Sequence, residues 1–321
     1  MANVVPLYEV RQSNALTEAR FNLSAVQLDL YFYLLTLLKV NDEPEKLYSI
    51  YVNEIEAMTG RKWNYQQLRE ATKDLLGKVI EWDDPQGNLC QTALISSAKY
   101  IKGSGCVKIT VSYLIRPLLW DLKGRYTTFQ LYCSLSMTSK FAKRLYMICS
   151  EWKNNIKTED TAFSREYTLD ELRDKLGLTD PTGKEPDQYK QWGQFKEKVL
   201  DMAKKQINQY SDLRINYKAR KFGRSYELVQ FTIQKNKNQQ LLIDFSQEDI
   251  QLQLERTNRK VNLIDNFKLT EQQANTVVRR LEPSVVNKVL QAVVEAHKKN
   301  PLKNIGAYTV SAIKNEFGIE L

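Results

Sequence analysis

The sequence predicts an α+β protein in which three helices followed by a β-hairpin occur twice, before an all-α C-terminal tail. Apolar residues recur first with the 3.6-residue period of helices and then with the two-residue period of strands, in each of two successive segments. Beyond residue 241 only the helical period remains. Three helices with a hairpin wing form a winged helix, so we expect winged-helix domains at 1–122 and 123–235 and a helical tail or small domain at 241–321.

The first expected domain opens with a polar, irregular segment over residues 1–22, after which Ser24 is the N-cap of an apolar core helix. Gly60 stops a short helix, and Lys102–Gly105 turns the chain into a cleanly alternating strand. The positions of the third helix that we expect to face inward are Tyr65, Leu68, Thr72 and Leu75. The expected helices are 25–39, 52–58 and 64–76, and the expected strands are 47–51, 79–82, 89–101 and 107–113.

The second expected domain follows a short apolar connector at 115–122. Thr168 and Glu171 have the capping-box spacing at the start of a short helix, and Gly177 ends that helix. A long amphipathic helix then leads to two alternating strands on either side of a basic turn. The expected helices are 140–153, 169–176 and 192–210, the strands are 213–217 and 229–233, and the basic turn is 218–224.

Positive charge is concentrated in the last helix and hairpin of the second domain. Residues 187–237 hold twelve Lys or Arg and five Asp or Glu, a net of +7, while the whole chain is +9. This layout suits a helix in the DNA major groove with its wing along the phosphates. An ordinary amphipathic helix with a solvated basic loop gives the same pattern, and this alternative stays open. The tail has eleven basic and ten acidic residues over 241–321, so we expect it to pack or to dock on protein.

Candidate DNA contacts lie on the polar side of each third helix and on the wing. In the second domain, Gln194 and Lys198 are near the start of the helix, where base edges are read. The candidates for phosphate contacts there are Lys190, Lys205, Arg220, Lys221 and Arg224. The corresponding candidates in the first domain are Arg61, Lys62, Gln67 and Lys73. Trp192 and Phe195 are expected to anchor the helix in the core. For every candidate, an exposed side chain without a ligand is the alternative.

Residue types that much enzyme chemistry requires are scarce. His297 is the single histidine and lies in a lysine-rich helix end, so a Ser/His/Asp triad has no other base to use and a metal site of several histidines is excluded. There is no GxxxxGK[ST] phosphate loop, and the four cysteines lack CxxC spacing, so we expect free thiols. No apolar run approaches the ~20 residues of a membrane span, and the first twenty residues lack a secretion signal. We therefore expect a cytoplasmic protein without enzymatic activity, cofactor, metal or membrane partner.

Several stretches resemble the iteron-binding plasmid replication initiators. QSNALTEAR before the first core helix is similar to the opening motif of that family. The stretches YIKGSGCVKITVSYLIRPLLWDL and YTTFQLYCSLSMTSKFAKRLYMI are similar to its domain junction, and YTLDELRDKLGL and KFGRSYELVQFTI to its second half. The resemblance covers about residues 8–235. It implies a bacterial protein that binds repeated double-stranded sites at a plasmid origin, recruits the host initiator ATPase and the replicative helicase, and represses its own gene as a dimer.

Two other classes of protein remain open. A winged-helix transcriptional repressor without an initiation role has the same charge and helix pattern, and only the resemblance argues against it. An adaptor that binds other proteins through its winged helices does not need a basic wing. We expect a monomer and a homodimer in equilibrium. The subunit interface is expected at the strand 107–113, which has alternating apolar residues, and at the connector 115–122, which is apolar.

Overall fold

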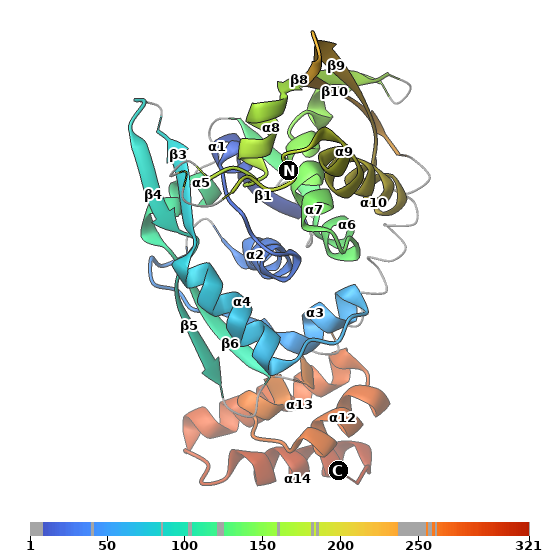
Figure 1. The fold of residues 1–321 in the computed structure, drawn as a ribbon. Coiled ribbons are helices and arrows are strands. Elements are labelled where there is room, and N and C mark those ends of the chain that lie inside the picture. Colours follow the sequence, from blue (N-terminus) through green and yellow to red (C-terminus); the bar gives the residue numbers. More distant parts are fainter. Residues whose placement is uncertain are drawn as a thin grey trace. The chain divides into compact units, whose positions relative to one another are not determined.

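The structure is a computed structural model that describes residues 9–39, 42–84, 86–101, 105–120, 125–158, 161–180, 183, 186–236, 255, 259–260 and 262–320. The chain forms two units, Met1–Gln247 and Glu248–Leu321, which are described separately. The start of the expected tail (241–254) and most of the expected turn Lys102–Gly105 lie outside the described residues. Figure 1 shows the order of the elements along the chain.

The first winged helix packs three helices against a three-stranded antiparallel sheet. The helices are α2 (Ala25–Leu37), α3 (Val52–Thr59) and α4 (Tyr65–Gly77), and the sheet has the order β2 (Tyr48–Tyr51), β6 (Cys106–Val111), β5 (Ile95–Ile101). Ser24 caps α2 in a reciprocal capping box with Gln27, and Gly60 ends α3 with a φ of 64°. The expected order of helices is confirmed. It could be predicted because caps and apolar periods specify these helices locally.

We expected the N-terminal segment to be irregular, but its described part contains a strand and a helix. β1 (Glu9–Ser13) pairs antiparallel with β7 (Tyr126–Gln130), and α1 (Asn14–Glu18) follows it. The polar sequence of this segment hides the strand, because its partner lies more than 100 residues further along the chain. The pairing holds β1 beside the junction of the two winged helices.

Other expectations for the first domain are wrong in detail. The strand expected at 89–101 is two strands, because β4 (Leu89–Ala93) leaves the main sheet and pairs with β3 (Val79–Asp83). Tyr65 faces outward with 63% of its surface exposed, and its ring meets that of Tyr100 edge-on. The strand β6 lies between β2 and β5 and is paired on both sides over Cys106–Ile109, so this stretch offers no free strand edge to a second subunit. The connector forms η1 (Tyr113–Ile115) and α5 (Pro117–Trp120).

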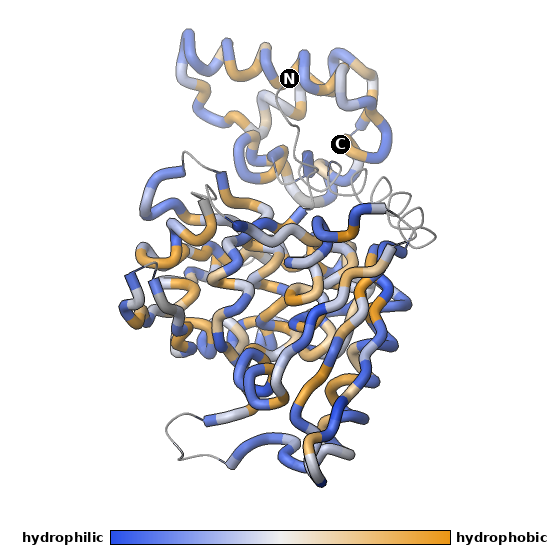
Figure 2. Tube along the Cα trace, turned by 90° about the horizontal axis from the view of Figure 1, so that it is seen from above, coloured by the Kyte–Doolittle hydropathy of each residue, from blue (hydrophilic) through white to orange (hydrophobic). Residues whose placement is uncertain are grey.

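The second winged helix repeats the arrangement. After α6 (Leu131–Ser136), its helices are α7 (Lys140–Ser150), followed by η2 (Lys153–Asn155), α8 (Leu169–Lys175) and a long helix of three parts, α9 (Trp192–Phe195), η3 (Lys196–Asp201) and α10 (Met202–Tyr210). Its antiparallel sheet has the order β8 (Phe163–Thr168), β10 (Ser225–Lys235), β9 (Leu213–Phe222). Val229, Phe231 and Ile233 alternate into the core, and the alternation of apolar and polar residues is visible along the chain in Figure 2.

The long helix differs from a regular α-helix in its middle turns. η3 is a π-helical segment, which adds a residue to the turn and rotates the positions that follow it. Met202, expected in the buried stripe, is therefore 41% exposed, while Leu200 and Ile207 are buried. Most of the expected basic turn is also strand, because β9 continues to Phe222 and only two residues form the turn itself.

Polar groups of the N-terminal segment bind two helices of the second winged helix. The buried guanidinium of Arg144, on α7, donates to the carbonyl oxygens of Thr17 and Ala19 on one side and of Lys175 on the other. Lys175 at the end of α8 forms an ion pair with Glu18. Part of the QSNALTEAR stretch therefore has a structural role, since it joins α1 to α7 and α8.

The C-terminal unit is helical throughout its described part. α12 (Glu271–Arg280), α13 (Pro283–Lys299) and α14 (Ile305–Phe317) enclose their own apolar core, which includes Leu263, Val277 and Val293. Thr270 and Gln273 form the reciprocal capping box of α12, and Pro283 occupies the first turn of α13. Among the described residues, no helix has the length and apolar character required to cross a membrane.

Candidate nucleic-acid interface

The long helix (α9, η3 and α10, residues 192–210) presents one side to the core and the other to solvent. Phe195, Val199, Ala203 and Ile207 are fully buried, at the spacing of a single stripe. The sequence candidates Gln194, Lys198 and Lys205 are all exposed on the outer side. The helix therefore displays amide and ammonium groups while it is anchored by apolar ones, as a helix that enters a DNA groove requires.

Strand β9 holds the second half of the long helix, from Asp201 onward. The Asn208 side chain accepts from the backbone N–H of Ile215 at 2.6 Å and donates to the carbonyl oxygen of Ile215 at 3.0 Å. The Tyr217 hydroxyl donates to Asp201 at 2.5 Å. Burial and this hydrogen bond raise the pKa of Tyr217, so the hydroxyl stays protonated. Figure 1 shows α10 beside β9, and these contacts fix the helix against the sheet.

The wing is the hairpin of β9 and β10, and its turn consists of Gly223 and Arg224. Gly223 has a φ of 63°, a left-handed conformation that glycine adopts without strain. Arg220, Lys221 and Arg224 are all exposed on the wing. The structure therefore brings the expected phosphate contacts together at one end of the hairpin.

Two wing cations already have partners within the protein. The Arg220 guanidinium lies 2.5 Å from a carboxylate oxygen of Glu166, on strand β8. The Lys221 ammonium lies 4.7 Å from the centre of the Tyr226 ring, and that ring stacks on Trp192 at 4.3 Å. Trp192 is thus only half-buried and contacts the wing, whereas Phe195 is the core anchor that we expected.

On the long helix, Lys198 forms an ion pair with its neighbour Glu197, with an N–O distance of 2.7 Å. The hydrogen bond and attraction to Glu197 raise the pKa of Lys198, so its ammonium remains charged. Lys190 is exposed just before the helix, and its carbonyl oxygen accepts from Arg173 at 2.6 Å. Both cations are accessible to a ligand, and neither packs into the core.

The candidates of the first domain are not one group. Arg61 donates to Asp29 at 2.7 Å and to the carbonyl oxygen of Leu135 at 3.0 Å, so its guanidinium is bound internally. The Gln67 side chain completes the N-cap of α4. Lys62 and Lys73 are exposed. Of the four candidates, Lys62 and Lys73 display their charge outward without such a structural contact among the described residues.

Sequence patterns did not reveal Glu166 or Tyr226 as parts of the interface. Glu166 lies on a strand more than 50 residues before Arg220, and nothing in its local pattern indicates that pairing. The side to which Tyr226 points depends on the register of the hairpin, which periodicity does not give. Both residues are known as neighbours of the wing cations only from the folded structure.

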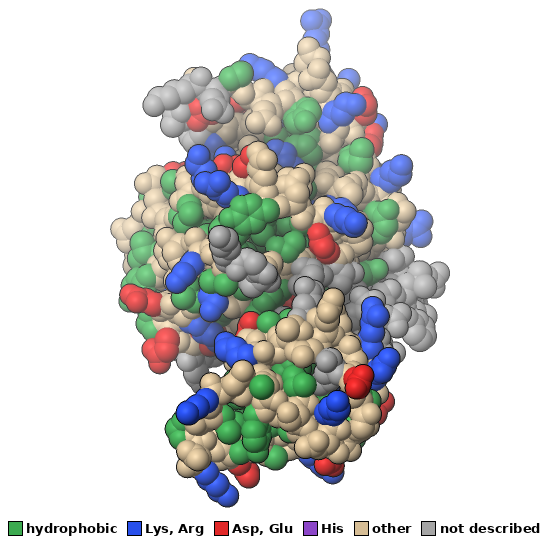
Figure 3. Space-filling model, turned by 90° about the horizontal axis from the view of Figure 1, so that it is seen from below, with side chains coloured by type: hydrophobic (Ala, Val, Ile, Leu, Met, Phe, Trp, Pro, Cys, Tyr) green, Lys and Arg blue, Asp and Glu red, His purple; other side chains and the backbone are tan. Residues whose placement is uncertain are grey.

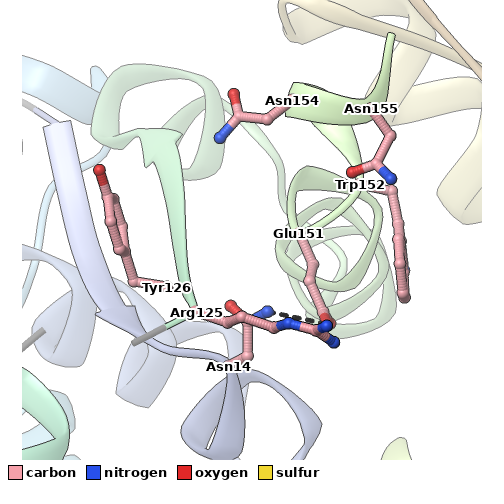
Figure 4. Close-up of a pocket in the computed structure, with 7 residues that line it drawn as sticks. All are labelled: Asn14, Arg125, Tyr126, Glu151, Trp152, Asn154 and Asn155. Carbon is pink, nitrogen blue, oxygen red and sulfur yellow. Dashed lines mark hydrogen bonds between the residues drawn. The ribbon is translucent and has the colours of Figure 1, made fainter. Parts of the chain in front are cut away.

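A polar hollow lies at the junction of the N-terminal segment with α7. It has a volume of about 440 Å³, and its lining residues are Asn14, Arg125, Tyr126, Glu151, Trp152, Asn154 and Asn155. Figure 4 shows these side chains around the hollow, with the Asn14 amide donating to Glu151 at 3.0 Å. Burial and a hydrogen bond with Glu18 raise the pKa of Glu151 to about 8. The described residues contain no group of three or more His, Cys, Asp or Glu side chains that could hold a metal ion.

Charge on the face drawn in Figure 3 is spread rather than gathered. Lys and Arg side chains stand singly there among acidic and apolar ones. The segment that contains the helix and wing of the second winged helix, residues 187–237, carries a net charge of +7.

Comparison with known proteins places the chain in a family. A family model described as initiator replication protein, WH1, matches residues 9–150, and one described as initiator Rep protein, WH2, matches 168–233. The crystal structure of the Pi initiator protein in complex with iteron DNA is similar in fold, with a TM-score of 0.58 and 19% identity over 73% of this chain and 99% of that one. The WH1 domain of a replication protein isolated from a multiple sclerosis patient matches 33% of this chain and 87% of its own, with 19% identity and a TM-score of 0.25, too low to support an argument. Since the two family models together span more than half of the chain, it belongs to the replication initiator protein family and contains both winged-helix domains of that family, WH1 and WH2.

Proposed function

We propose that the protein initiates plasmid replication by binding repeated double-stranded DNA sites, or iterons, at the origin. The observation that carries this proposal is the exposed outer side of the long helix in WH2, next to a wing with three exposed cations. The two-winged-helix fold that it shares with the Pi initiator, whose crystal structure contains iteron DNA, supports the same ligand. Membership of the initiator family supports the role in replication.

Within WH2, the proposed contacts are of two kinds. Gln194 and Lys198 near the start of the long helix would contact base edges. The proposed phosphate contacts are Lys190, Lys205, Arg220, Lys221 and Arg224. Arg220 is included because a guanidinium paired with Glu166 keeps donors free for a second anion. In WH1 we retain Lys62 and Lys73, whose side chains are exposed, and omit Arg61 and Gln67, whose side chains have structural partners.

The remaining partners are also proposals, supported by the resemblance to iteron-binding initiators. The protein would recruit the host initiator ATPase and the replicative helicase in the bacterial cytoplasm. It would bind iterons as a monomer and repress its own gene as a homodimer. We further propose that WH1 occupies residues 1–122, WH2 residues 123–235 and a separate helical domain residues 241–321, which limited proteolysis followed by mass spectrometry would test.

Footprinting of the purified protein on the DNA that flanks its own gene tests the proposed function. An initiator is expected to protect several directly repeated sites with a regular spacing. A double variant, Gln194→Ala with Lys198→Ala, serves as the control and should lose these footprints while it keeps its melting temperature. A single protected inverted repeat would instead identify a repressor, and no protection on any flanking DNA would refute sequence-specific binding.

A further inference from the structure

One residue of the wing, Glu227, has no partner across the hairpin. Tyr226 pairs with Lys221 and Leu228 pairs with Arg220, so the register shifts by one residue between them. Side chains alternate between the two sides of a sheet, so in a regular hairpin Tyr226 would share the side of Leu228. The bulge at Glu227 reverses this, because an extra residue in one strand re-aims the side chains beyond it.

The re-aimed side chains point to the side of the sheet that packs on the long helix. Along β9, Ile215, Tyr217 and Ala219 alternate with Arg214, Asn216 and Lys218, and the first set is the more buried. Lys221 continues the first set, and Tyr226 is its cross-strand partner. The tip of the wing therefore directs an aromatic ring and an ammonium group toward the helix.

There the two side chains meet the first residue of α9. The rings of Tyr226 and Trp192 are stacked, with 4.3 Å between their centres and 21° between their planes. The Lys221 ammonium lies 4.7 Å from the centre of the Tyr226 ring. Trp192 and Tyr226 are half-buried, and Lys221 is exposed. An indole, a phenol ring and a cation thus follow one another from the start of the helix to the tip of the wing.

We propose that this Trp192–Tyr226–Lys221 stack sets the position of the wing against the long helix, and that Tyr226 is a positioning residue for DNA binding. The inference rests on the proposed function, since it takes Lys221 to bind a phosphate. The stack restrains the Lys221 ammonium before DNA arrives, which reduces the ordering that binding requires. It also holds the phosphate contact at a fixed place relative to Gln194, two residues after Trp192, so that the wing and the helix bind in one register.

Side-chain replacements with binding measured at several salt concentrations test the stack. Tyr226→Leu removes the aromatic ring, Tyr226→Phe keeps it, and Lys221→Ala removes the cation. We expect Tyr226→Leu and Lys221→Ala each to weaken binding to the specific repeat about 5-fold. Each should also lower the slope of log K against log salt by about one unit, the share of one phosphate. The variant that combines Tyr226→Leu with Lys221→Ala should bind no more weakly than either single variant. Tyr226→Phe should bind like the wild type.

The control is Phe222→Leu, which removes another aromatic ring from the same hairpin. Phe222 is 55% exposed and lies next to Lys221 on the opposite side of the sheet. The Phe222→Leu substitution should therefore leave the salt slope unchanged. Melting temperatures identify any variant that does not fold. If Tyr226→Leu fails to fold, Trp192→Leu, at the other end of the stack, tests the same claim by its salt slope.

Three results with the Tyr226 variants would overturn the proposal: an unchanged slope for folded Tyr226→Leu, strictly additive losses in the variant that combines Tyr226→Leu with Lys221→Ala, or a Tyr226→Phe variant as weak as Tyr226→Leu. An unchanged slope for Lys221→Ala would also overturn it, because the wing cation would then bind no phosphate. That last result leaves the proposed function standing if Lys198→Ala still discriminates between the specific repeat and a scrambled duplex. Loss of discrimination from the wild type itself would refute the proposed function.

Discussion

Replacing Glu151 by Gln is expected to stabilise the protein above neutral pH and to leave its stability unchanged in acid. Glu151 follows α7 and accepts from the Asn14 amide. Burial and a hydrogen bond with Glu18 raise the pKa of Glu151 to about 8. Burial also raises the pKa of Glu18, but hydrogen bonds with Glu151 and Lys175 and the positive charge of Lys175 outweigh burial, so the pKa of Glu18 is lowered. Near neutral pH Glu151 therefore keeps its proton while Glu18 is ionised.

The direction of the effect follows from the protons bound. Unfolded Glu151 releases its proton near its ordinary pKa of 4.5, whereas the folded protein keeps it to about pH 8. The folded state binds more protons in this window, so the free energy of unfolding falls as pH rises from about 5 to 8. Gln retains the donor and the acceptor of the protonated acid and does not titrate. Because Glu151 is only partly buried, the full shift is discounted for solvent screening, and we expect a gain of about 1 kcal/mol at pH 8.5.

Thermal melts of wild type and Glu151→Gln at pH 5, 7 and 8.5, at one ionic strength, measure this effect. A gain of about 1 kcal/mol corresponds to a rise in Tm of roughly 2–4 °C in a unit of this size. The Tm difference should be close to zero at pH 5 and should grow with pH. Glu45→Gln makes the same charge change at an exposed turn and controls for net charge. A difference that does not vary with pH, or a variant less stable than wild type at pH 8.5, would refute the reasoning.

Three other variants test the interface and the core. Lys198→Ala should lose roughly 5- to 150-fold on the specific repeat and little on a scrambled duplex, because a good base contact discriminates by ~1–3 kcal/mol; equal losses on both in a binding titration would make Lys198 a phosphate contact. Replacing Arg220 and Lys221 together by Ala should flatten the salt slope by one to two units and weaken all duplexes alike; an unchanged slope would show that the wing does not bind DNA. Asp29→Ala leaves the fully buried Lys143 without its carboxylate and should lower the unfolding free energy by about 3–5 kcal/mol in urea titrations, whereas a loss under 1 kcal/mol would contradict the buried ion pair.

The parts of the fold that could be predicted are those that the sequence specifies locally. Ser24 and Gln27 mark the start of α2, Gly60 marks the end of α3, and the alternation before and after Gly223 marks the wing. Each signal depends on residues within a few positions of one another. The strand β1 is the counterexample, because four of its five residues are polar and their partner strand is far along the chain.

Candidate site residues were predictable by type but not by the direction of their side chains. Lys198 and Lys221 are exposed where a charged helix face and a hairpin tip place them. Arg61 has the same chemistry and a similar place before a third helix, yet it binds Asp29, whose burial no local pattern reveals. Tyr226 was missed because one unpaired residue in a strand reverses the side to which it points, and a period of two cannot show that residue in advance.

The contacts of Arg144 limit how the chain can be divided. Its buried guanidinium donates to three carbonyl oxygens, and two of these, on Thr17 and Ala19, belong to the N-terminal segment. Its planar face also lies over the Phe21 ring at 3.9 Å. A fragment that begins at residue 123 would keep Arg144 but lose the two carbonyl oxygens and the aromatic ring that the N-terminal segment supplies to it. The guanidinium would then lack two of its three hydrogen-bond acceptors. Independent expression of the second winged helix would therefore require either the first 21 residues supplied as a separate peptide or an apolar residue in place of Arg144.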